Sequence, residues 1–565
     1  TVHHLYRFPT CPFPIFSLFG FISRVLVLID LQSGSDQVRL SSIPLLDLEI
    51  PVYASIPNPK PLRLSRAPPP IAVTVLPSRR CCLNPILNLD HRIKMDGHLM
   101  RTRKRPRLCY HGPVIKKTRA KVHLADLSED LLSVVLSKLP IKDAVRTGVL
   151  SSKWKHMWKG CSKLKFDGVT VCSSSVFGAQ EYTQKFIDTV NAVMQHHQCI
   201  VVDELVIKFG FDSRLVDHVN IWIKFAVLSH TKSLGLDLAP EIFRGRTDRY
   251  KFPVELLDDA SIFRLRHLKL SFASFELPPQ FSGFPNLRTL DLHMLRVTAK
   301  DIQDMLSNCV NLEWFSMIRC HLNDDLTVAC PLSKLLYLSV AHCNITKIVL
   351  NAVKLETFMF YGRLYPIDLG RAPELKHVFL DLYSYVTLEH ALTVLPKVIS
   401  SVQDLALRAI FPLKMPLLVE TPCKFSQLKY LNLRLILKDE EAGNILSLAS
   451  FLRAAPYVEK LEMHFSVFDF AHEVSKPIKS LPRCPHNYLK NLHITGFSGT
   501  TGQLEFLVHA VENAPVLKTL TVKGADLTGR DLDHIGKRRF SFQFRELERE
   551  YLRGIISPNA EIRII

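Results

Sequence analysis

The stretch LEWFSMIRC at residues 312–320 is followed by a second stretch of the same pattern, LLYLSVAHC at residues 335–343. In each, a leucine is followed at +3 and +5 by two more apolar residues. The same pattern recurs along the chain. Its clear cases begin at Leu265, Leu287, Leu312, Leu335, Leu355, Leu375, Leu428, Leu489 and Leu517, and weaker cases begin at Val202, Thr231, Val402 and Val458. The intervals between the first six clear starts are similar, so the pattern predicts one structural unit repeated many times.

This spacing resembles that of leucine-rich repeats, in which each unit supplies one short parallel strand. The +3 and +5 side chains then point into the core, and stacking the units builds an irregular solenoid. Cys320 and Cys343 lie eight residues after Leu312 and Leu335, where such repeats place a small residue under the turn. We interpret both cysteines as buried packing residues, because free cysteine behaves as a small hydrophobe.

Strand alternation sends the residues between the core positions to the open, concave face of the solenoid. In the units that begin at Leu312 to Leu375 many of these residues are aromatic, and aromatic anchors are typical of protein-binding hot spots. We therefore predict a substrate-binding patch formed by Trp314, Ile318, Tyr337, Met359, Tyr361, His377 and Phe379. Four of these, Trp314, Tyr337, Tyr361 and Phe379, are expected to form one diagonal stripe. A shifted register or a covering terminal segment is the alternative.

Residues 127–160 read LSEDLLSVVLSKLPIKDAVRTGVLSSKWKHMWKG, a pattern typical of three short amphipathic helices. Ser128 is a candidate N-cap of the first helix, and Pro140 is expected to end it. A second helix is expected from about Lys142, and a third carries Trp154 and Trp158. A unit of this size buries little apolar surface by itself, so its leucines and tryptophans suggest a surface that a partner completes.

This stretch resembles an F-box, although Ser128 stands where the family usually has a proline. The resemblance implies docking to the Skp-type adaptor of a cullin-based ubiquitin ligase. It assigns the adaptor-binding positions to Leu127, Leu131, Leu136, Leu139, Pro140, Leu150, Trp154 and Trp158, of which the first five are the preferred contacts. The alternative is that the tryptophans and Leu150 only fill the small core of the unit.

From Cys484 onward the sequence predicts a strand with Leu492 and Ile494, a turn, a helix from Gln503 to Asn513, and another strand. This segment resembles the FBD domain that closes many plant proteins built from an F-box and leucine-rich repeats. Such a domain could cap the solenoid, which otherwise ends in an unpaired strand edge.

The net charge of +19 comes mainly from the N-terminal part of the chain, because 72 lysines and arginines stand against 53 acidic residues overall. Residues 95–125 carry nine of these basic residues and one acidic residue. Within them, Lys104, Arg105, Lys116, Lys117 and Arg119 resemble a bipartite nuclear localisation signal. A solvated basic linker is the alternative. We expect the protein in the nucleus, the cytoplasm or both.

Residues 1–94 contain thirteen of the 34 prolines, and the first methionine of the chain is Met95. The segment shows no sustained period of an amphipathic helix or strand, and Pro14 and Arg24 interrupt its apolar run. We expect it to be disordered or an upstream extension rather than a domain.

Together these observations predict an α/β repeat fold: a short three-helix F-box, an irregular leucine-rich-repeat solenoid with parallel strands, and an FBD-like cap. The expected divisions are 1–94 for the extension, 95–122 for the basic linker, 123–165 for the F-box, 166–483 for the repeats and 484–565 for the C-terminal domain. The expected function is substrate recognition in an SCF-type (Skp-cullin-F-box) E3 ubiquitin ligase, with a protein target and a cullin reached through the adaptor.

A nuclear scaffold or nucleic-acid-binding protein that assembles no ligase is the alternative. We expect neither cofactor nor metal, because the thirteen cysteines form no C-x-x-C pair and have no histidine at metal spacing. The histidines and carboxylates show no local catalytic signature either, so we expect a non-catalytic subunit.

Overall fold

The computed structural model describes residues 128–149, 154–172, 179–243, 246–281, 283–412, 424–437, 439–467 and 479–524, together with 552, 554–556 and 560–565. The predicted extension at 1–94 and the whole basic linker, with its five import-signal residues, lie outside the described residues. Leu127 and Leu150 of the predicted adaptor-binding set lie outside them as well.

The F-box region folds into short helices, as its pattern predicts. Ser128 is the N-cap of α2 (Glu129–Leu136), and its hydroxyl accepts a hydrogen bond from the Leu131 backbone N–H. The helix ends earlier than expected, because the N–H groups of Lys138 and Leu139 bond to carbonyls three residues back. Pro140 instead precedes the next helix. The remaining elements of the region are α3 (Ile141–Arg146), η2 (Thr147–Val149), α4 (Trp154–Met157) and η3 (Trp158–Gly160).

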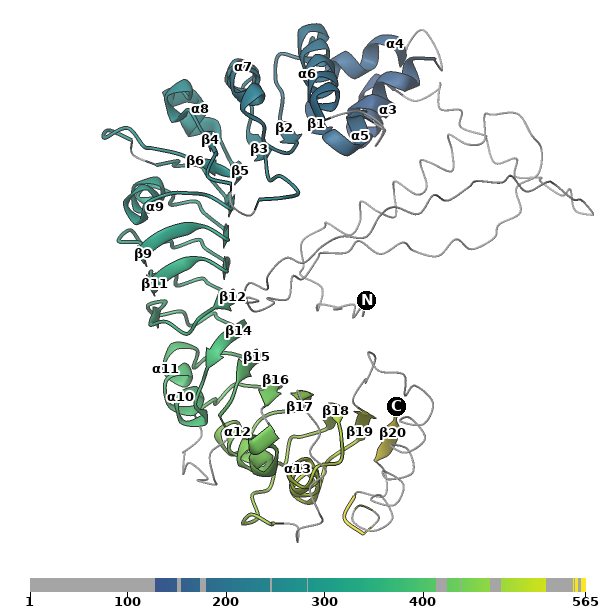
Figure 1. Cartoon of the computed structure of the whole chain (residues 1–565), viewed down its shortest axis with the longest axis vertical. Coiled ribbons are helices and arrows are strands. Elements are labelled where there is room, and N and C mark those ends of the chain that lie inside the picture. Colours follow the sequence, from purple (N-terminus) through teal and green to yellow (C-terminus); the bar gives the residue numbers. More distant parts are fainter. Residues whose placement is uncertain are drawn as a thin grey trace, which may run out of the picture. The chain divides into compact units, whose positions relative to one another are not determined.

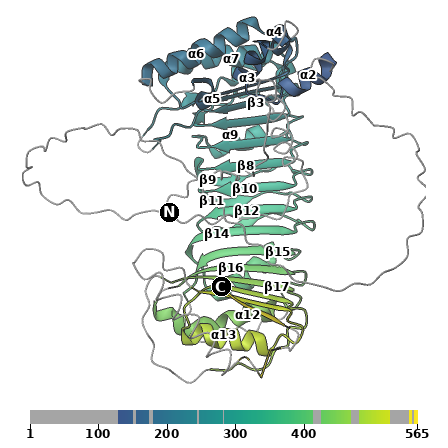
Figure 2. The ribbon, with the colours of Figure 1, turned by 90° about the vertical axis from the view of Figure 1, so that its right-hand side faces the viewer.

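The described part of the solenoid forms one parallel sheet of 15 strands, which stack as a ladder in Figure 2. Each neighbouring pair is in register, so that the apolar +3 residues of successive repeats, such as Leu290, Phe315 and Leu338, line up across the sheet. The strands are β1 (Lys163–Asp167), β2 (Glu204–Lys208), β3 (Ser233–Asp237), β5 (His267–Ser271), β7 (Thr289–His293), β8 (Trp314–Ile318), β10 (Tyr337–Ala341), β12 (Thr357–Gly362), β14 (His377–Tyr385), β15 (Asp404–Ile410), β16 (Tyr430–Leu437), β17 (Lys460–Val467), β18 (Asn491–Phe497), β19 (Thr519–Gly524) and β20 (Glu561–Ile564).

Every predicted repeat start, clear or weak, stands just before one of these strands, so the predicted fold class is confirmed. The side chains at +3 and +5 are buried, as Phe315 and Met317 illustrate. The edge strands β1 and β20 are additional to the predicted set. For β20 the reason is that Asn559 stands where the pattern requires an apolar residue.

The convex side of the sheet, opposite its concave face, is covered by a mixed layer of helices and short strands (Figure 1). Its helical elements are α5 (Gly168–Cys172), α6 (Ala179–His196), η4 (Ser213–Leu215), α7 (Val216–Leu228), η5 (Val254–Leu256), α8 (Asp259–Arg264), α9 (Ala299–Leu306), α10 (Leu388–Thr393), α11 (Leu395–Val398), η6 (Asp439–Leu448), α12 (Ala449–Ala454) and α13 (Thr501–Glu512). Its strands are β4 (Tyr250–Lys251) and β6 (Ala273–Ser274), which pair with each other, and β9 (His321–Thr327), β11 (Asn344–Val349) and β13 (Ile367–Asp368), which form a small parallel sheet.

Repeat length decides which kind of outer element a unit carries. The three successive units that begin at Leu312, Leu335 and Leu355 are shorter than the unit before them, and they use β9, β11 and β13. The longer unit, which begins at Leu287 and ends before Leu312, accommodates the helix α9. A short strand spans the return path with fewer residues than a helix, because a residue rises further in a strand.

Cys320 and Cys343 are buried beneath the turns, as predicted. The Cys320 thiol lies 3.4 Å from the Leu292 carbonyl, and the Cys343 thiol lies 3.5 Å from the Met317 carbonyl. Each cysteine thus fills the space under one repeat and contacts the repeat before it.

The C-terminal segment continues the same sheet. The predicted order of strand, turn, helix and strand appears as β18, the turn that follows it, α13 and β19. β20 then pairs in parallel with β19 and lies at the end of the sheet.

Candidate functional site

The F-box region presents apolar side chains to solvent. Leu131 and Val134 on α2 are each 54% exposed, and Val149 of η2 is 88% exposed. Val145 of α3 is also exposed. A helix places residues three apart on the same side, so Leu131 and Val134 form one apolar strip on α2. Exposed aliphatic groups gathered in so small a unit are typical of a surface that a partner covers.

The structure separates the predicted adaptor-binding residues into a surface group and a core group. Leu131 and Pro140 are exposed, while Leu139 and Trp158 are half-buried and pack against the core. Leu136 and Trp154 are buried, at 1% and 3% exposure, and therefore belong to the core instead of the surface. For Leu136 this corrects the preferred contact set. For Trp154 it agrees with the alternative that the tryptophans fill the core.

Sequence reasoning missed Val134, Val145 and Val149 as surface residues. In α2 it assigned Leu136 outward, but each residue turns a helix by about 100°, so Leu132 and Leu136 face inward together. The four-residue spacing of Leu132 and Leu136 is the signal that could have shown this.

The concave side of the central strands carries an aromatic patch, which we define as Trp314, Tyr337, Met359, Tyr361 and Phe379. Trp314 and Tyr337 are direct neighbours in register on β8 and β10, and their rings stack at 3.5 Å between centroids and 11° between planes. Tyr361 and Phe379, on β12 and β14, form a second ring pair with centroids 5.1 Å apart.

Met359 joins the two pairs. The Tyr337 hydroxyl donates to the Met359 sulfur at 2.9 Å, and Met359 lies beside Phe379 in the register of β12 and β14. The patch is therefore two ring pairs bridged by a thioether, which differs from the single diagonal stripe expected from the sequence. The reason is that Tyr361 lies beside Ala341 and not beside Tyr337.

All five side chains of the aromatic patch are half-buried, so they keep a solvent-facing surface while their positions are fixed by neighbours. Burial, with a smaller contribution from the charge of Asp381, raises the pKa of Tyr361 to about 12. The Tyr361 hydroxyl is therefore neutral at physiological pH, and the patch offers apolar rings and this neutral hydroxyl.

Ile318 and His377, the other two predicted substrate-binding residues, lie at the margin of the aromatic patch. Ile318 is half-buried at the end of β8. His377 is exposed, and its Nδ1 lies 2.7 Å from a carboxylate oxygen of Asp404 on β15. His377 thus begins the polar part of the concave face.

The polar part is centred on Glu462 of β17, which sequence reasoning did not identify. One Glu462 oxygen accepts hydrogen bonds from the Tyr430 hydroxyl at 2.7 Å and the Asn432 amide at 2.8 Å, and the other lies 2.7 Å from Lys460 Nζ. Burial by itself would raise the pKa of Glu462, but hydrogen bonds from His464, Lys460 and Tyr430 outweigh it and hold the pKa well below its usual range. We call these residues, Tyr430, Asn432, Lys460, Glu462 and His464, the Glu462 cluster.

Within the part of the chain that the structure describes, no group of three or more His, Cys, Asp or Glu side chains could hold a metal ion. A helix with the length and hydrophobicity needed to cross a membrane is likewise absent from the described ranges.

Comparison with known proteins agrees with this architecture. A family model described as "At1g61320/AtMIF1, LRR domain" matches residues 193–551, which is more than half of the chain. The chain belongs to this leucine-rich-repeat family. The model of the F-box domain matches residues 124–166, so the chain also carries an F-box.

Relatives from Arabidopsis thaliana share most of the length. The F-box/FBD/LRR-repeat protein At3g52680 is 26% identical over 438 residues, which cover 75% of this chain and 90% of the relative. The F-box/FBD/LRR-repeat protein At1g13570 is 24% identical over 416 residues, which cover 71% of this chain and 91% of the relative. These names confirm the predicted kinship with F-box/LRR/FBD proteins.

Among solved structures, the LRR protein LIC12759 of Leptospira interrogans matches with a TM-score of 0.31 and 14% identity, over 66% of this chain and 85% of that protein.

Proposed function

We propose that the chain is the substrate-recognition subunit of an SCF-type E3 ubiquitin ligase. In this proposal the F-box binds a Skp-type adaptor, which connects the chain to a cullin, and the concave face of the repeats binds a protein target. The chain performs no chemistry itself. Its contribution is to raise the concentration of the target beside the conjugating enzyme.

The observation that carries the proposal is the exposed aliphatic surface of the F-box region. Leu131, Val134 and Val149 are more than half exposed, although Leu132 and Leu136 next to them are fully buried. The described part of the region thus buries a small core and still leaves apolar residues uncovered, which favours a protein partner. The F-box match implies that this partner is a Skp-type adaptor.

The adaptor site is tested by replacing Leu131 and Val134 with aspartate in the full chain. Both side chains are exposed, so we expect the fold to persist and copurification of the Skp-type adaptor to fall at least tenfold, as charges enter an apolar interface. Ile221→Asp is the matched control, because Ile221 on α7 is 55% exposed and lies outside the F-box.

Adaptor binding that survives the double change in a folded protein would place the contact elsewhere. If the unmodified chain never copurifies with an adaptor, the nuclear scaffold or nucleic-acid-binding alternative replaces the ligase proposal.

The aromatic patch is proposed as the target-binding surface. Its rings are half-buried and ordered by stacking, so a target that contacts them orders few additional side chains. Aromatic residues held in this way are typical of binding hot spots.

Nuclear import is proposed for the basic linker because Lys104, Arg105, Lys116, Lys117 and Arg119 form two basic clusters with a short spacer. Lys116→Ala with Lys117→Ala is expected to shift a fluorescent fusion toward the cytoplasm. An unchanged distribution would show that the linker is not the signal.

A further inference from the structure

The carboxyl ends of strands β5 to β10 form a second ordered surface next to the aromatic patch. The residue after each strand has a left-handed backbone, with φ of +57° at Phe272, +54° at Met294, +54° at Arg319 and +54° at His342. Each of these residues donates its backbone N–H to the next repeat, and Arg319 N–H reaches the Ala341 carbonyl at 2.8 Å. These backbone hydrogen bonds between successive repeats fix the Arg319 backbone at this edge of the sheet.

The loop that follows β3 packs against this edge through aromatic and guanidinium groups. The Arg319 guanidinium lies 5.3 Å from the centroid of the Phe243 ring, and the Arg249 guanidinium lies 3.8 Å from the centroid of Phe272. The Arg296 backbone N–H donates to the Ala273 carbonyl at 3.0 Å, directly after Phe272. Burial lowers the pKa of Arg249, the charge of Asp248 opposes this, and the charges of Arg246 and Arg296 add to it. These contacts place Arg249, Arg296 and Arg319 in one neighbourhood, which we call the arginine cluster.

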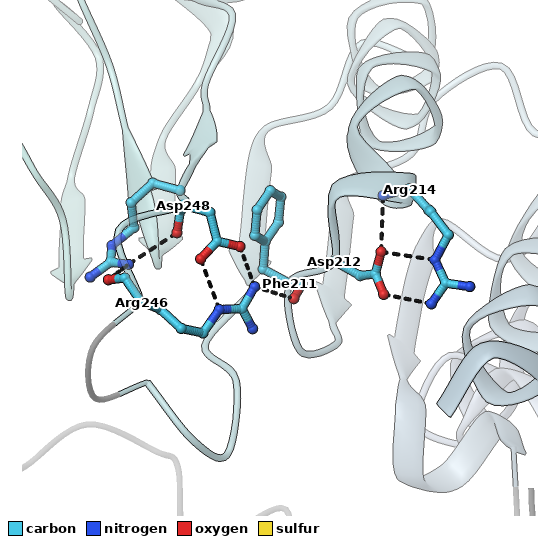
Figure 3. A network of polar contacts seen from close by, with 6 residues as sticks. Phe211, Asp212, Arg214, Arg246 and Asp248 are labelled. Atoms are coloured by element: carbon cyan, nitrogen blue, oxygen red, sulfur yellow. Dashed lines mark hydrogen bonds and ion pairs between the residues drawn. The ribbon is translucent and has the colours of Figure 1, made fainter. Parts of the chain in front are cut away.

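The carboxylates of the adjoining loops are already bound to other arginines (Figure 3). Asp248 accepts from Arg246 at 2.9 Å, and Arg246 also donates to the Phe211 carbonyl at 3.0 Å. Asp212 forms an ion pair with Arg214 at 2.6 Å. These pairs hold the loops in place, and the charge of Asp248 also acts on Arg249 without forming an ion pair with it.

Among the described residues, no carboxylate forms an ion pair with Arg249, Arg296 or Arg319. Arg249 is half-buried, its Nη1 donates to the carbonyls of Arg246 and Asp248, and its buried Nε has no hydrogen-bond acceptor in the described structure. Several cations elsewhere on the concave face form ion pairs, among them Lys165 with Glu204 at 2.8 Å and Arg408 with Asp381 at 3.0 Å.

A group of arginines without ion-pair partners, two of them stacked on aromatic rings, is suited to an anion. Guanidinium groups bind carboxylates and phosphates through parallel hydrogen bonds, and stacking on a ring orients them for this. Mutual repulsion between neighbouring cations is relieved when an anion binds, so the charge pattern is complementary to an acidic partner.

The arginine cluster is continuous with the aromatic patch. Ile318, which directly precedes Arg319, lies beside Ala341, and Ala341 lies beside Tyr361. Strands are about 4.8 Å apart, so Arg319 and Tyr361 belong to positions separated by two strand spacings, about 10 Å. An extended peptide spans that distance with about three residues.

We infer that the protein target docks through a short segment in which an acidic side chain binds the arginine cluster while a neighbouring apolar side chain contacts the aromatic patch. This inference rests on the proposed function, because it specifies which class of segment the target offers. The negative charge comes from aspartate or glutamate, or from a phosphorylated residue.

The probe for this site is a short fluorescein-labelled peptide in which glutamate alternates with tryptophan, and fluorescence anisotropy measures its binding to the full chain. A second peptide carries glutamine in place of glutamate, and a third carries phosphoserine. We expect both anionic peptides to bind at least tenfold more tightly than the glutamine peptide, with the difference shrinking at high salt. Their order of affinity identifies carboxylate or phosphate as the preferred charge.

Arg249→Gln with Arg319→Gln is expected to remove this preference and to weaken the anionic peptides at least tenfold. The matched control is Lys300→Gln with Lys347→Gln, which removes the same charge from exposed positions on α9 and β11. Arg319→Gln alone serves as a second variant, because Arg249 also bonds to its own loop and its loss could disturb folding.

Equal binding of the glutamate and glutamine peptides would overturn the inference, as would an equal loss of affinity in the lysine control. A single-stranded oligonucleotide that binds more tightly than either anionic peptide, and loses affinity in the arginine variant, would also overturn it in favour of nucleic acid. Adaptor copurification measured on the same preparations separates the two proposals: if the adaptor binds but charge selectivity is absent, the inference fails while the ligase proposal stands.

Discussion

The aromatic patch and the Glu462 cluster occupy equivalent outward positions of one sheet, yet their chemistry is opposite. On β8 to β14 these positions hold rings and a thioether, and on β16 and β17 they hold a carboxylate with its hydrogen-bond donors. The inward positions are alike in both regions, with Phe315 and Met317 in one and Leu461 and Met463 in the other buried to the same degree. The repeat therefore fixes the backbone and the core, while the outward row is free to differ from unit to unit.

This difference predicts that the two regions have separate roles. Removing a half-buried ring from the aromatic patch by mutation should have little effect on the core. Glu462, in contrast, is held by partners from two strands and joins those strands together. We expect changes in the aromatic patch to affect target binding, and changes in the Glu462 cluster to affect stability.

The largest expected effect is on target capture. Replacing Trp314 and Tyr361 with alanine is expected to cost about 2 kcal/mol or more for each ring, because both central anchors of the patch are removed. Capture of the target and its ubiquitination should be lost, while adaptor binding at the F-box should be unchanged.

The matched control for this experiment lies on the polar side of the same face. His493→Ala with Thr521→Ala alters two half-buried outward residues of β18 and β19 and should leave target capture intact. If capture persists in the folded aromatic variant and disappears in this control, the target binds the concave face at β18 and β19 instead of at the aromatic patch.

A smaller effect is expected on the free energy of unfolding. Glu462→Gln keeps the shape of the side chain but removes the charge that Tyr430, Asn432 and Lys460 share, so we expect a loss of about 1–3 kcal/mol. Met359→Leu, a nearly volume-conserving change within the aromatic patch, should cost less than about 1.5 kcal/mol. Urea denaturation followed by circular dichroism measures both, and equal losses would contradict the proposed division.

The smallest effect concerns acid stability. Because the pKa of Glu462 is lowered in the folded chain, its contribution is present above the unfolded value of about 4.5 and is lost as the pH falls below it. The difference in unfolding free energy between the original chain and Glu462→Gln should therefore be full at pH 6 and shrink toward pH 3. A difference that stays constant across this range would mean that the charge of Glu462 is not what stabilises the cluster.

The sequence predicts the backbone well because the leucine pattern is local. Each repeat contains its own +3 and +5 residues, so the strand that follows Leu312 can be recognised without knowledge of its neighbours. The outward positions follow from the same register, and this placed the aromatic residues on the concave face. The F-box pattern was equally local, although it placed Leu136 on the surface when it belongs to the core.

The Glu462 cluster and the arginine cluster, which sequence reasoning missed, depend on residues that are far apart in the chain. Glu462 meets Tyr430 from another repeat, and no spacing within either repeat indicates a carboxylate centre. Arg249 and Arg319 come together because the loop after β3 packs along the strand ends, and loop packing has no periodic signal.

The exchange of outer helices for the strands β9, β11 and β13 has a consequence for local curvature. Packed helices need about 8–10 Å between their axes, whereas strands on both faces need only about 4.8 Å, so a repeat backed by a strand is equally wide inside and outside. A wedge-shaped unit bends a stack, and a unit with parallel sides does not. The stretch backed by β9, β11 and β13 should thus be the straightest part of the sheet, and it is the stretch that carries Trp314, Tyr337 and Tyr361. Those rings therefore project from a flat segment of the sheet. The spacing of the strands in this segment is set by backbone hydrogen bonds on both faces.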